Sequence, residues 1–247
     1  VVGMFLAILD IQIVASSLEN IQAGLSASPD EIGWVQTSYL IAEVVMIPLS
    51  GFLSRLISTR WLFVASAIGF TIFSIASAFA WSIESMIWFR AAQGFLGGAM
   101  IPTVFATTYI IFPADKRNTA SVMIGLIATM APTVGPTLGG YLTQSFSWHW
   151  LFLINVLPGM LIALVVAITL DVDRGDRSLL RGFDLRGLLA MAAFLGSLEY
   201  VLDEGPKDDW FDERAIVYGA VICVISGLYF FRRMFTYDHP IVDLRSF

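Results

Sequence analysis

Four ionisable residues interrupt long apolar segments of this sequence, and they are the side chains best placed to do chemistry. They are Asp10, Glu43, Arg90 and Glu199. An ionisable group at membrane depth is costly, so it usually faces the protein interior or a water-filled path. Burial disfavours the charged form of a carboxylate, whereas a nearby arginine favours it. We therefore interpret Asp10 opposite Arg90 as the leading pair for gaining and losing a proton, with Glu43 assisting.

Each of these residues also has a purely structural interpretation. A permanent salt bridge between Asp10 and Arg90 would only hold two helices together. Glu43, about midway along its segment, is open to the same interpretation. Glu199 lies near the end of its segment and, like the acidic stretch at residues 203–214, is interpreted as solvated.

The elements that must position these residues are membrane-spanning helices. Of the 247 residues, 57% are hydrophobic and 14% are charged, whereas soluble domains carry about 25% charged residues. A hydrocarbon core needs about 20 helical residues per span, and lipid admits only helices or closed barrels. Runs such as residues 61–80 lack the alternation of barrel strands. Eight helical spans are predicted, near residues 1–18, 33–53, 61–80, 85–112, 120–144, 150–170, 185–202 and 215–231.

The basic residues predict the orientation of the spans, because Lys and Arg in short loops stay on the cytoplasmic side. If the first span runs outward, all but three of the 14 lysines and arginines fall in inner loops. The exceptions are Arg90, inside a span, and Lys207 and Arg214, in an outer loop. Both ends of the segment are then expected in the cytoplasm. Five tryptophans, which favour the headgroup region, fall at outer boundaries: Trp34, Trp81, Trp148, Trp150 and Trp210.

Several kinds of chemistry are not expected. Neither Lys116 nor Lys207 lies in a Gly-Lys-Ser/Thr loop that could hold nucleotide phosphates. His149 and His239 lack the i, i+4 partner of a helical zinc site, and no Gly-x-Ser-x-Gly elbow occurs. The net charge of −6 argues against nucleic acid as a partner. Together with the single Cys223, these features predict no enzyme activity, no metal and no cofactor.

Small residues and prolines mark the fourth and fifth predicted spans. Glycines at i, i+4 spacing permit close helix contact, and prolines inside a helix remove backbone donors and kink it. These residues predict a hinge or a close-packing face, with mere tolerance of proline in membrane helices as the alternative. They are Gly94, Gly98, Pro132, Gly135, Pro136 and Gly139.

Several motifs occur together in the order found in one transporter family. Residues 9–14 (LDIQIV) resemble its first-helix aspartate motif. Residues 90–94 (RAAQG) match its fourth-helix R-x-x-Q-G motif, which is associated in that family with proton transfer. Residues 131–140 (APTVGPTLGG) match a fifth-helix motif resembling that of exporters. Residues 150–156, 183–187 and 238–244 also look like this branch. The chain thus resembles the major facilitator superfamily, specifically the fourteen-span EmrB/QacA-type drug:proton antiporters.

One loop departs from the superfamily pattern. Residues 51–60 read GFLSRLISTR, where the pattern G-x-x-x-D-R-x-G-R-R has Asp at the position of Arg55 and Gly at that of Ser58. The resemblance gives Gly51 and Arg55 a place in gating. Because of the two replacements, we expect this loop either to be gated differently or to be less strained.

The resemblance implies an all-α polytopic membrane bundle with the major facilitator fold. Residues 1–170 would form the N-terminal six-helix half, residues 171–184 a cytoplasmic loop, and residues 185–233 two additional transmembrane helices. Residues 234–247 would begin a cytoplasmic linker to a C-terminal half that this sequence lacks. Alone, the segment is not expected to transport.

The function implied is proton-coupled multidrug efflux of amphiphilic or cationic organic compounds by alternating access, in the bacterial inner membrane. For Gram-negative members the resemblance also implies docking to a periplasmic adaptor and an outer-membrane channel. Gln36, Tyr39, Gln93 and Phe105 are candidates to face the substrate cavity. Two alternatives stay open: export of one specific metabolite or siderophore, and a non-transporting membrane sensor or scaffold.

Overall fold

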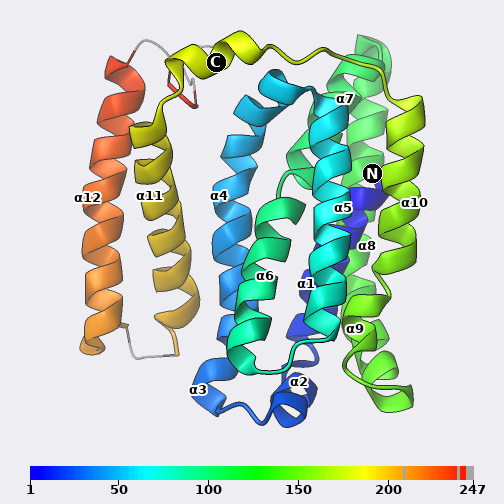
Figure 1. The fold of residues 1–247 in the computed structure, drawn as a ribbon, viewed down its shortest axis with the longest axis vertical. Coiled ribbons are helices and arrows are strands. Elements are labelled where there is room, and N and C mark those ends of the chain that lie inside the picture. Colours follow the sequence, from blue (N-terminus) through cyan, green and yellow to red (C-terminus); the bar gives the residue numbers. More distant parts are fainter. Residues whose placement is uncertain (208–209, 238–239, 243–247) are drawn as a thin grey trace.

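The chain is a bundle of membrane-length helices (Figure 1). The structure is a computed structural model that describes residues 1–207, 210–237 and 240–242, without the side chain of Arg181. Within these ranges every regular element is helical. The α-helices are α1 (Val2–Ala15), α2 (Leu18–Leu25), α3 (Pro29–Ile32), α4 (Trp34–Ile57), α5 (Thr59–Ala78), α6 (Ile83–Gly97), α7 (Met100–Ile111), α8 (Ala114–Ser145), α9 (Trp150–Leu153), α10 (Val156–Thr169), α11 (Leu185–Glu204) and α12 (Arg214–Thr236). Two short 3-10 helices are η1 (Arg177–Gly182) and η2 (Trp210–Asp212).

The predicted all-α membrane bundle is confirmed, and the first of several differences lies in the first span. Among the described residues, seven spans are long and apolar enough to cross a membrane, and α1 with α2 makes an eighth if the bent pair is one span. The sequence predicts a span near residues 1–18, whereas α1 ends at Ala15 and the chain bends by 65° between α1 and α2. The Ser16 hydroxyl bonds back to the carbonyl of Ile13 at the bend. The following α2 carries Glu19 and Asn20, polar residues that favour the membrane surface over its interior.

Several helices are longer than predicted, and in α8 and α12 the added turns carry charged residues. The fifth span is predicted to start at residue 120, but α8 begins at Ala114 and includes Asp115 in its first turn. The eighth span is predicted to end at residue 231, but α12 continues to Thr236, with Arg233 in its last turn. Acidic residues at a helix start and basic ones at its end suit the helix dipole. Of the predicted linker, residues 238–239 and 243–247, including His239, lie outside the described residues.

The fourth and sixth spans are interrupted rather than continuous. The fourth is divided between α6 and α7 at Gly98 and Ala99, and the sixth between α9 and α10 at Ile154 and Asn155. Each pair still forms one membrane-length unit, residues 83–111 and 150–169. The second interruption places a polar residue, Asn155, at the N-terminus of α10 inside the bundle, where it is fully buried.

The glycines singled out from the sequence lie at close helix contacts. A Cβ atom at Gly94 would lie 2.3 Å from the carbonyl oxygen of Tyr39, so α6 meets the backbone of α4 there. On α8, a Cβ at Gly139 would lie 2.8 Å from the carbonyl oxygen of Ile13 in α1. Pro132 and Pro136 are exposed on α8, which continues through both without a break. The glycines are therefore packing positions, and the hinge role of Pro132 and Pro136 stays a prediction.

The hairpin of α11 and α12 packs on the bundle beside α4, on the side away from α8 and α10 (Figure 1). The rings of Trp34 and Tyr200 stack with centroids 5.6 Å apart. Near them the Thr37 hydroxyl, which has one proton to donate, lies within hydrogen-bond distance of carboxylate oxygens of Glu204, at 2.7 Å, and of Asp203. The expectation that the acidic stretch is merely solvated is therefore wrong for its first two residues, Asp203 and Glu204, which dock on α4.

Lys207 completes this contact at the end of α11. Its ammonium lies 2.9 Å from Oε1 of Glu204 and 3.5 Å from Oδ2 of Asp203. Partial burial acts to lower the pKa of Lys207, but the hydrogen bond to Glu204 and the two carboxylates outweigh it and raise the pKa above its ordinary value. At the other end of the interface, the rings of Phe52 and Phe183 lie 5.2 Å apart. The hairpin therefore contacts α4 near both of its ends.

Candidate functional site

An ion pair between α1 and α6 lies in the interior of the bundle. Nη1 of Arg90 is 2.5 Å from Oδ2 of Asp10, and both side chains are fully buried, at 0% exposure. Bulk water does not reach this pair, so the attraction between the two charges is much stronger than in a surface salt bridge. Separating the two charges would also cost more free energy than at the surface. The structure thus brings together the two residues that the sequence proposed as partners.

Each end of this pair has further partners. The guanidinium of Arg90 donates from Nη1 to Oε1 of Gln93, at 2.9 Å, and from Nε to the carbonyl of Val35, at 3.3 Å. Its central carbon lies 4.2 Å from the ring centroid of Tyr39, a cation–π contact. The amide of Gln93 donates in turn to Oδ1 of Asp10, at 3.2 Å. Arg90 is therefore held by α4 as well as by α1.

Asn155, which the site prediction missed, is the third donor to Asp10. Its Nδ2 lies 2.6 Å from Oδ1 of Asp10 and 3.2 Å from the hydroxyl of Ser74 on α5. The Ser74 hydroxyl donates in turn to the carbonyl of Phe152, next to the break between α9 and α10. Asn155 occupies the N-cap of α10, where asparagine normally caps its own helix, yet its side chain makes no cap hydrogen bond. The signals in the sequence were a polar amide inside an apolar span and its place in the family-like segment at residues 150–156.

The arrangement links the charge of one carboxylate to four helices. Asp10 on α1 accepts hydrogen bonds from Arg90 and Gln93 on α6 and from Asn155 on α10, while Ser74 ties α5 to the same amide. Hydrogen bonds to a charged group are worth about 1.5–3 kcal/mol each. A proton added to Asp10 would remove the negative charge that attracts Arg90. It would also weaken the hydrogen bonds that Arg90, Gln93 and Asn155 donate to this carboxylate. The charge of Asp10 therefore contributes to contacts among all four helices.

Glu43 is buried but lies outside this hydrogen-bonded cluster. Its side chain is 7% exposed, and Oε1 has no hydrogen-bond partner in the described part of the chain. It lies one helical turn after Tyr39, whose ring makes the cation–π contact with Arg90. A buried carboxylate oxygen without a partner needs an explanation, such as a bound water or a second protonation site.

The four candidate substrate residues divide into two pairs. Tyr39 and Gln93 are fully buried and are engaged with Arg90, so they support the ion pair rather than face an open cavity. Gln36 is half-buried, and Phe105 on α7 is 41% exposed. Of the four, only Gln36 and Phe105 are accessible to a ligand in this structure.

The loop between α4 and α5 is strained, contrary to one of the two expectations for it. Ser58 adopts φ 84° and ψ 149°, a conformation that favours glycine. A serine thus occupies a backbone conformation that glycine adopts without strain. Gly51 is exposed with open space beside it, and Nε of Arg55 bonds back to the carbonyl of Gly51, at 3.3 Å.

A carboxylate from a distant loop holds this strained turn. Asp173, from the loop after α10, accepts from the backbone nitrogen of Thr59 at 2.9 Å and from its hydroxyl at 2.7 Å. The nitrogen of Asp176 donates to the carbonyl of Arg55, at 2.8 Å. The loop at residues 171–184 therefore caps the start of α5, a contact that the sequence did not indicate.

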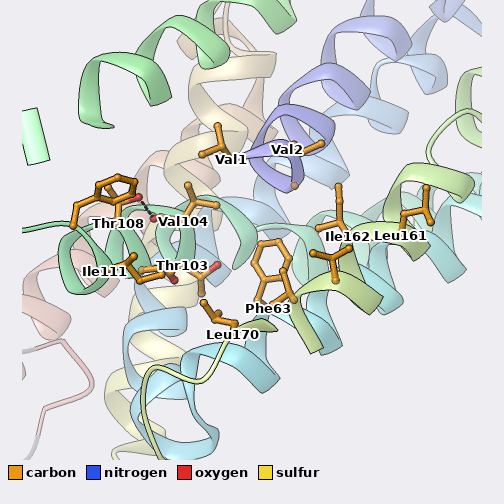
Figure 2. Close-up of a pocket in the computed structure, with 15 residues that line it drawn as sticks. Val1, Val2, Phe63, Thr103, Val104, Thr108, Ile111, Leu161, Ile162 and Leu170 are labelled. Atoms are coloured by element: carbon orange, nitrogen blue, oxygen red, sulfur yellow. Dashed lines mark hydrogen bonds between the residues drawn. The ribbon is translucent and has the colours of Figure 1, made fainter. Parts of the chain in front are cut away.

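A mostly apolar pocket of about 470 Å³ lies apart from the buried cluster (Figure 2). It is bounded by the start of α1, by α7 and by α10, with Phe63 of α5. Threonine hydroxyls are its polar side chains, and that of Thr108 is already bonded to the carbonyl of Val104. None of the site residues predicted from the sequence lines it.

Comparison with known proteins places this geometry in a family context. The family model described as Major Facilitator Superfamily matches residues 1–242. The chain is 50% identical over 245 residues to the colistin resistance protein EmrB of Acinetobacter baumannii, covering 99% of this chain and 48% of that protein. It is 34% identical to the multidrug export protein EmrB of Escherichia coli K12, covering 98% and 47%. It is 32% identical to the fatty acid resistance protein FarB of Neisseria gonorrhoeae, covering 99% and 48%. The chain thus spans about half the length of these relatives.

Solved structures share this fold. A bacterial homologue of the human lysosomal transporter Spinster, in an inward-facing conformation, matches with a TM-score of 0.55 at 16% identity, over 90% of this chain and 58% of the other. The human organic anion transporter MFSD10 matches with a TM-score of 0.57 at 13% identity, over 91% and 67%. At these identities the likeness shows the fold alone.

Proposed function

This chain belongs to the major facilitator superfamily, and from that premise we propose that it supplies the N-terminal half of a proton-coupled exporter of amphiphilic or cationic organic compounds. The observation that carries the proposal is the buried Asp10–Arg90 pair with its three-donor arrangement around one carboxylate. A relative named as a multidrug export protein, at 34% identity over almost the whole chain, supports the substrate class.

In the proposed cycle, protonation of Asp10 and binding of substrate alternate. With Asp10 ionised, its pairing with Arg90 holds α1 against α6. A proton from the outer side would neutralise Asp10, release Arg90 toward Gln93 and the Tyr39 ring, and loosen the contact with Asn155. The two halves would then rock about the site, as in alternating access. Glu43 is the proposed second proton carrier, because its buried Oε1 has no partner among the described residues.

The proposed organisation follows the helices. Residues 1–170 form the six-helix half, residues 171–184 the loop that caps α5, and residues 185–233 the additional hairpin on α4. With the arginine-rich ends of the helices in the cytoplasm, the protein lies in the bacterial inner membrane and both ends of this segment face inward. A periplasmic adaptor and an outer-membrane channel are the proposed partners in a Gram-negative cell. Because the relatives are about twice as long, a second helical half is proposed to follow residue 247.

The test of the function is a flux measurement on the full-length protein in proteoliposomes. A fluorescent organic cation is followed together with a pH-sensitive dye. We expect an imposed proton gradient to drive movement of the cation, and an imposed cation gradient to drive movement of protons. A dedicated exporter would move protons only when one metabolite or siderophore is supplied and would ignore the cation in competition. A sensor or scaffold would give no flux with any substrate. Either result would overturn the multidrug proposal.

Asn155 provides a second test, because it donates to Asp10 without carrying charge. Asn155→Ala removes the 2.6 Å hydrogen bond to Asp10, and we expect gradient-driven efflux to fall about tenfold or more, the equivalent of a charge-assisted hydrogen bond of about 1.5–3 kcal/mol. Ser74→Ala is the matched control, because it leaves that bond in place, and it should cost much less.

A double-mutant cycle separates positioning from simple damage to the fold. In an Asp10→Asn background the thermal destabilisation caused by Asn155→Ala should shrink, because the charged acceptor is already gone. Additive losses in the double variant, or a Ser74→Ala effect as large as that of Asn155→Ala, would show that Asn155 acts only on packing.

A further inference from the structure

A groove between α11 and α12 opens toward the lipid and ends at exposed arginines. It encloses about 480 Å³. Its walls are apolar and outward-facing: Leu189, Ile222 and Ile225 are each more than half exposed. Because both helices are membrane spans, whatever fills the groove must be apolar over most of its length. The groove is lined by Arg186, Leu189 and Ala190 on α11, and by Ile222, Ile225, Ser226 and Tyr229 on α12.

One end of the groove is cationic. Arg186 lines it directly, one turn before Leu189. On α12, Arg232 follows Tyr229 by three residues and Ile225 by seven, so all three lie on one stripe of the helix. Both arginine side chains are exposed, and in the described part of the chain neither has a hydrogen-bond or ion-pair partner for its guanidinium. Two exposed cations thus stand just beyond the apolar walls.

The nearby carboxylate does not neutralise these cations. Oδ1 of Asp184 lies 2.6 Å from Nε of Arg233 and also accepts from the backbone nitrogen of Gly187, at 2.8 Å. The Asp184 charge is therefore already balanced by Arg233. Among the described residues, the mouth of the groove therefore keeps a net positive charge. Guanidinium groups match phosphate oxygens in geometry and charge.

An apolar groove with a cationic mouth is complementary to one class of molecule, a lipid with acyl chains and an anionic headgroup. We propose that the α11–α12 groove is a binding site for an anionic phospholipid of the cytoplasmic leaflet. An acyl chain lies against Leu189, Ile222 and Ile225, and the phosphate is held between Arg186 and Arg232. The choice of leaflet rests on the proposed orientation in the membrane, whereas the site itself does not. Anionic lipids of the cytoplasmic leaflet attract basic residues at helix ends in this way.

Occupancy of the groove bears on the proton site through α4. The hairpin packs on α4 through Trp34 with Tyr200 and through Phe52 with Phe183. A lipid that holds α11 to α12 therefore stabilises the packing of the hairpin on α4. Because Tyr39 of α4 contacts the guanidinium of Arg90, this packing also supports the position of Arg90. We expect the anionic lipid to raise the melting temperature of the protein as well as to bind it.

The experiment measures retained lipid on the full-length protein by native mass spectrometry. The protein is equilibrated with phosphatidylglycerol and phosphatidylethanolamine of identical acyl chains and is then washed with detergent. We expect phosphatidylglycerol to be retained preferentially, and the double variant Arg186→Gln, Arg232→Gln to lose that preference about tenfold or more. Arg214→Gln, at the other end of α12, removes the same kind of charge and should keep the preference.

Two further arms separate the parts of the site. Ser226→Phe narrows the groove without removing charge and should also lower retention of phosphatidylglycerol. Glycerophosphoglycerol, the headgroup without acyl chains, should not compete. Equal retention of the two lipids, an unchanged preference in the double variant, effective competition by the headgroup, or a protein bound in place of lipid would each overturn the proposal. Lipid retention is measured without transport, so its failure leaves the exporter proposal intact.

Discussion

Asp10→Asn is expected to reduce gradient-driven efflux by the full-length protein to the background of cells that lack it. The substitution keeps the size of the side chain but removes the charge that pairs with Arg90 at 2.5 Å. Without a titrating group, the site no longer distinguishes a protonated from an ionised state, so the proton gradient has nothing to act on. Substrate binding, measured by fluorescence on the purified protein, should remain detectable.

The control for this substitution is Glu199→Gln on α11. It also removes a carboxylate at membrane depth, but from a partly exposed position, and it should leave efflux close to that of the unchanged protein. Because Asp10→Asn leaves Arg90 buried without a counter-charge, some loss of stability is expected, and membrane abundance must be measured in parallel. Unchanged efflux at normal abundance would refute the role given to Asp10.

Gly94→Ala is expected to be among the most damaging single-methyl changes in the bundle. The added Cβ would lie 2.3 Å from the carbonyl oxygen of Tyr39 and 3.0 Å from its Cα. These are backbone atoms that cannot rotate away, so α6 and α4 must separate. Overpacking of a core costs about 1–3 kcal/mol, and a backbone obstacle favours the upper end of that range. Separating α6 from α4 also moves the Tyr39 ring out of its cation–π contact with Arg90. Efflux should therefore fall together with the melting temperature.

Gly125→Ala on α8 is the matched control, because no neighbouring atom lies within 4 Å of its added Cβ. Alanine also has a higher helix propensity than glycine, so this variant should melt at or slightly above the temperature of the unchanged protein. Both variants are compared by thermal unfolding in detergent. If they melted alike, the tight contact between α4 and α6 would have to be abandoned.

Much of the architecture could be predicted because the signals are local. Eight spans followed from hydropathy, and the buried charges on α1, α4 and α6 followed from single residues in apolar runs. The bend after α1 and the breaks inside the fourth and sixth spans did not follow. They depend on where a freed backbone carbonyl finds a partner, such as that of Phe152, which accepts from Ser74 on another helix.

The candidate site also has a part that could be predicted from the sequence and a part that could not. Composition and position alone singled out Asp10 and Arg90, because an ionisable group at membrane depth is costly and usually faces a partner or a water-filled path. They did not show that Tyr39 and Gln93 surround that pair rather than line a cavity wall, since helical phase leaves a side chain's neighbours undetermined. The strained turn at Ser58 was missed for a related reason. The carboxylate of Asp173 that holds it comes from a loop far along the chain.

The sequence by itself thus determined which segments enter the membrane and which side chains are too costly to leave there without a partner. The free energy of transferring a residue into hydrocarbon depends mainly on that residue and its near neighbours. Only the tertiary structure decided which groups meet around Asp10. Asn155 lies 145 residues away in the chain, and it reaches the carboxylate only because α10 begins at that position and faces α1.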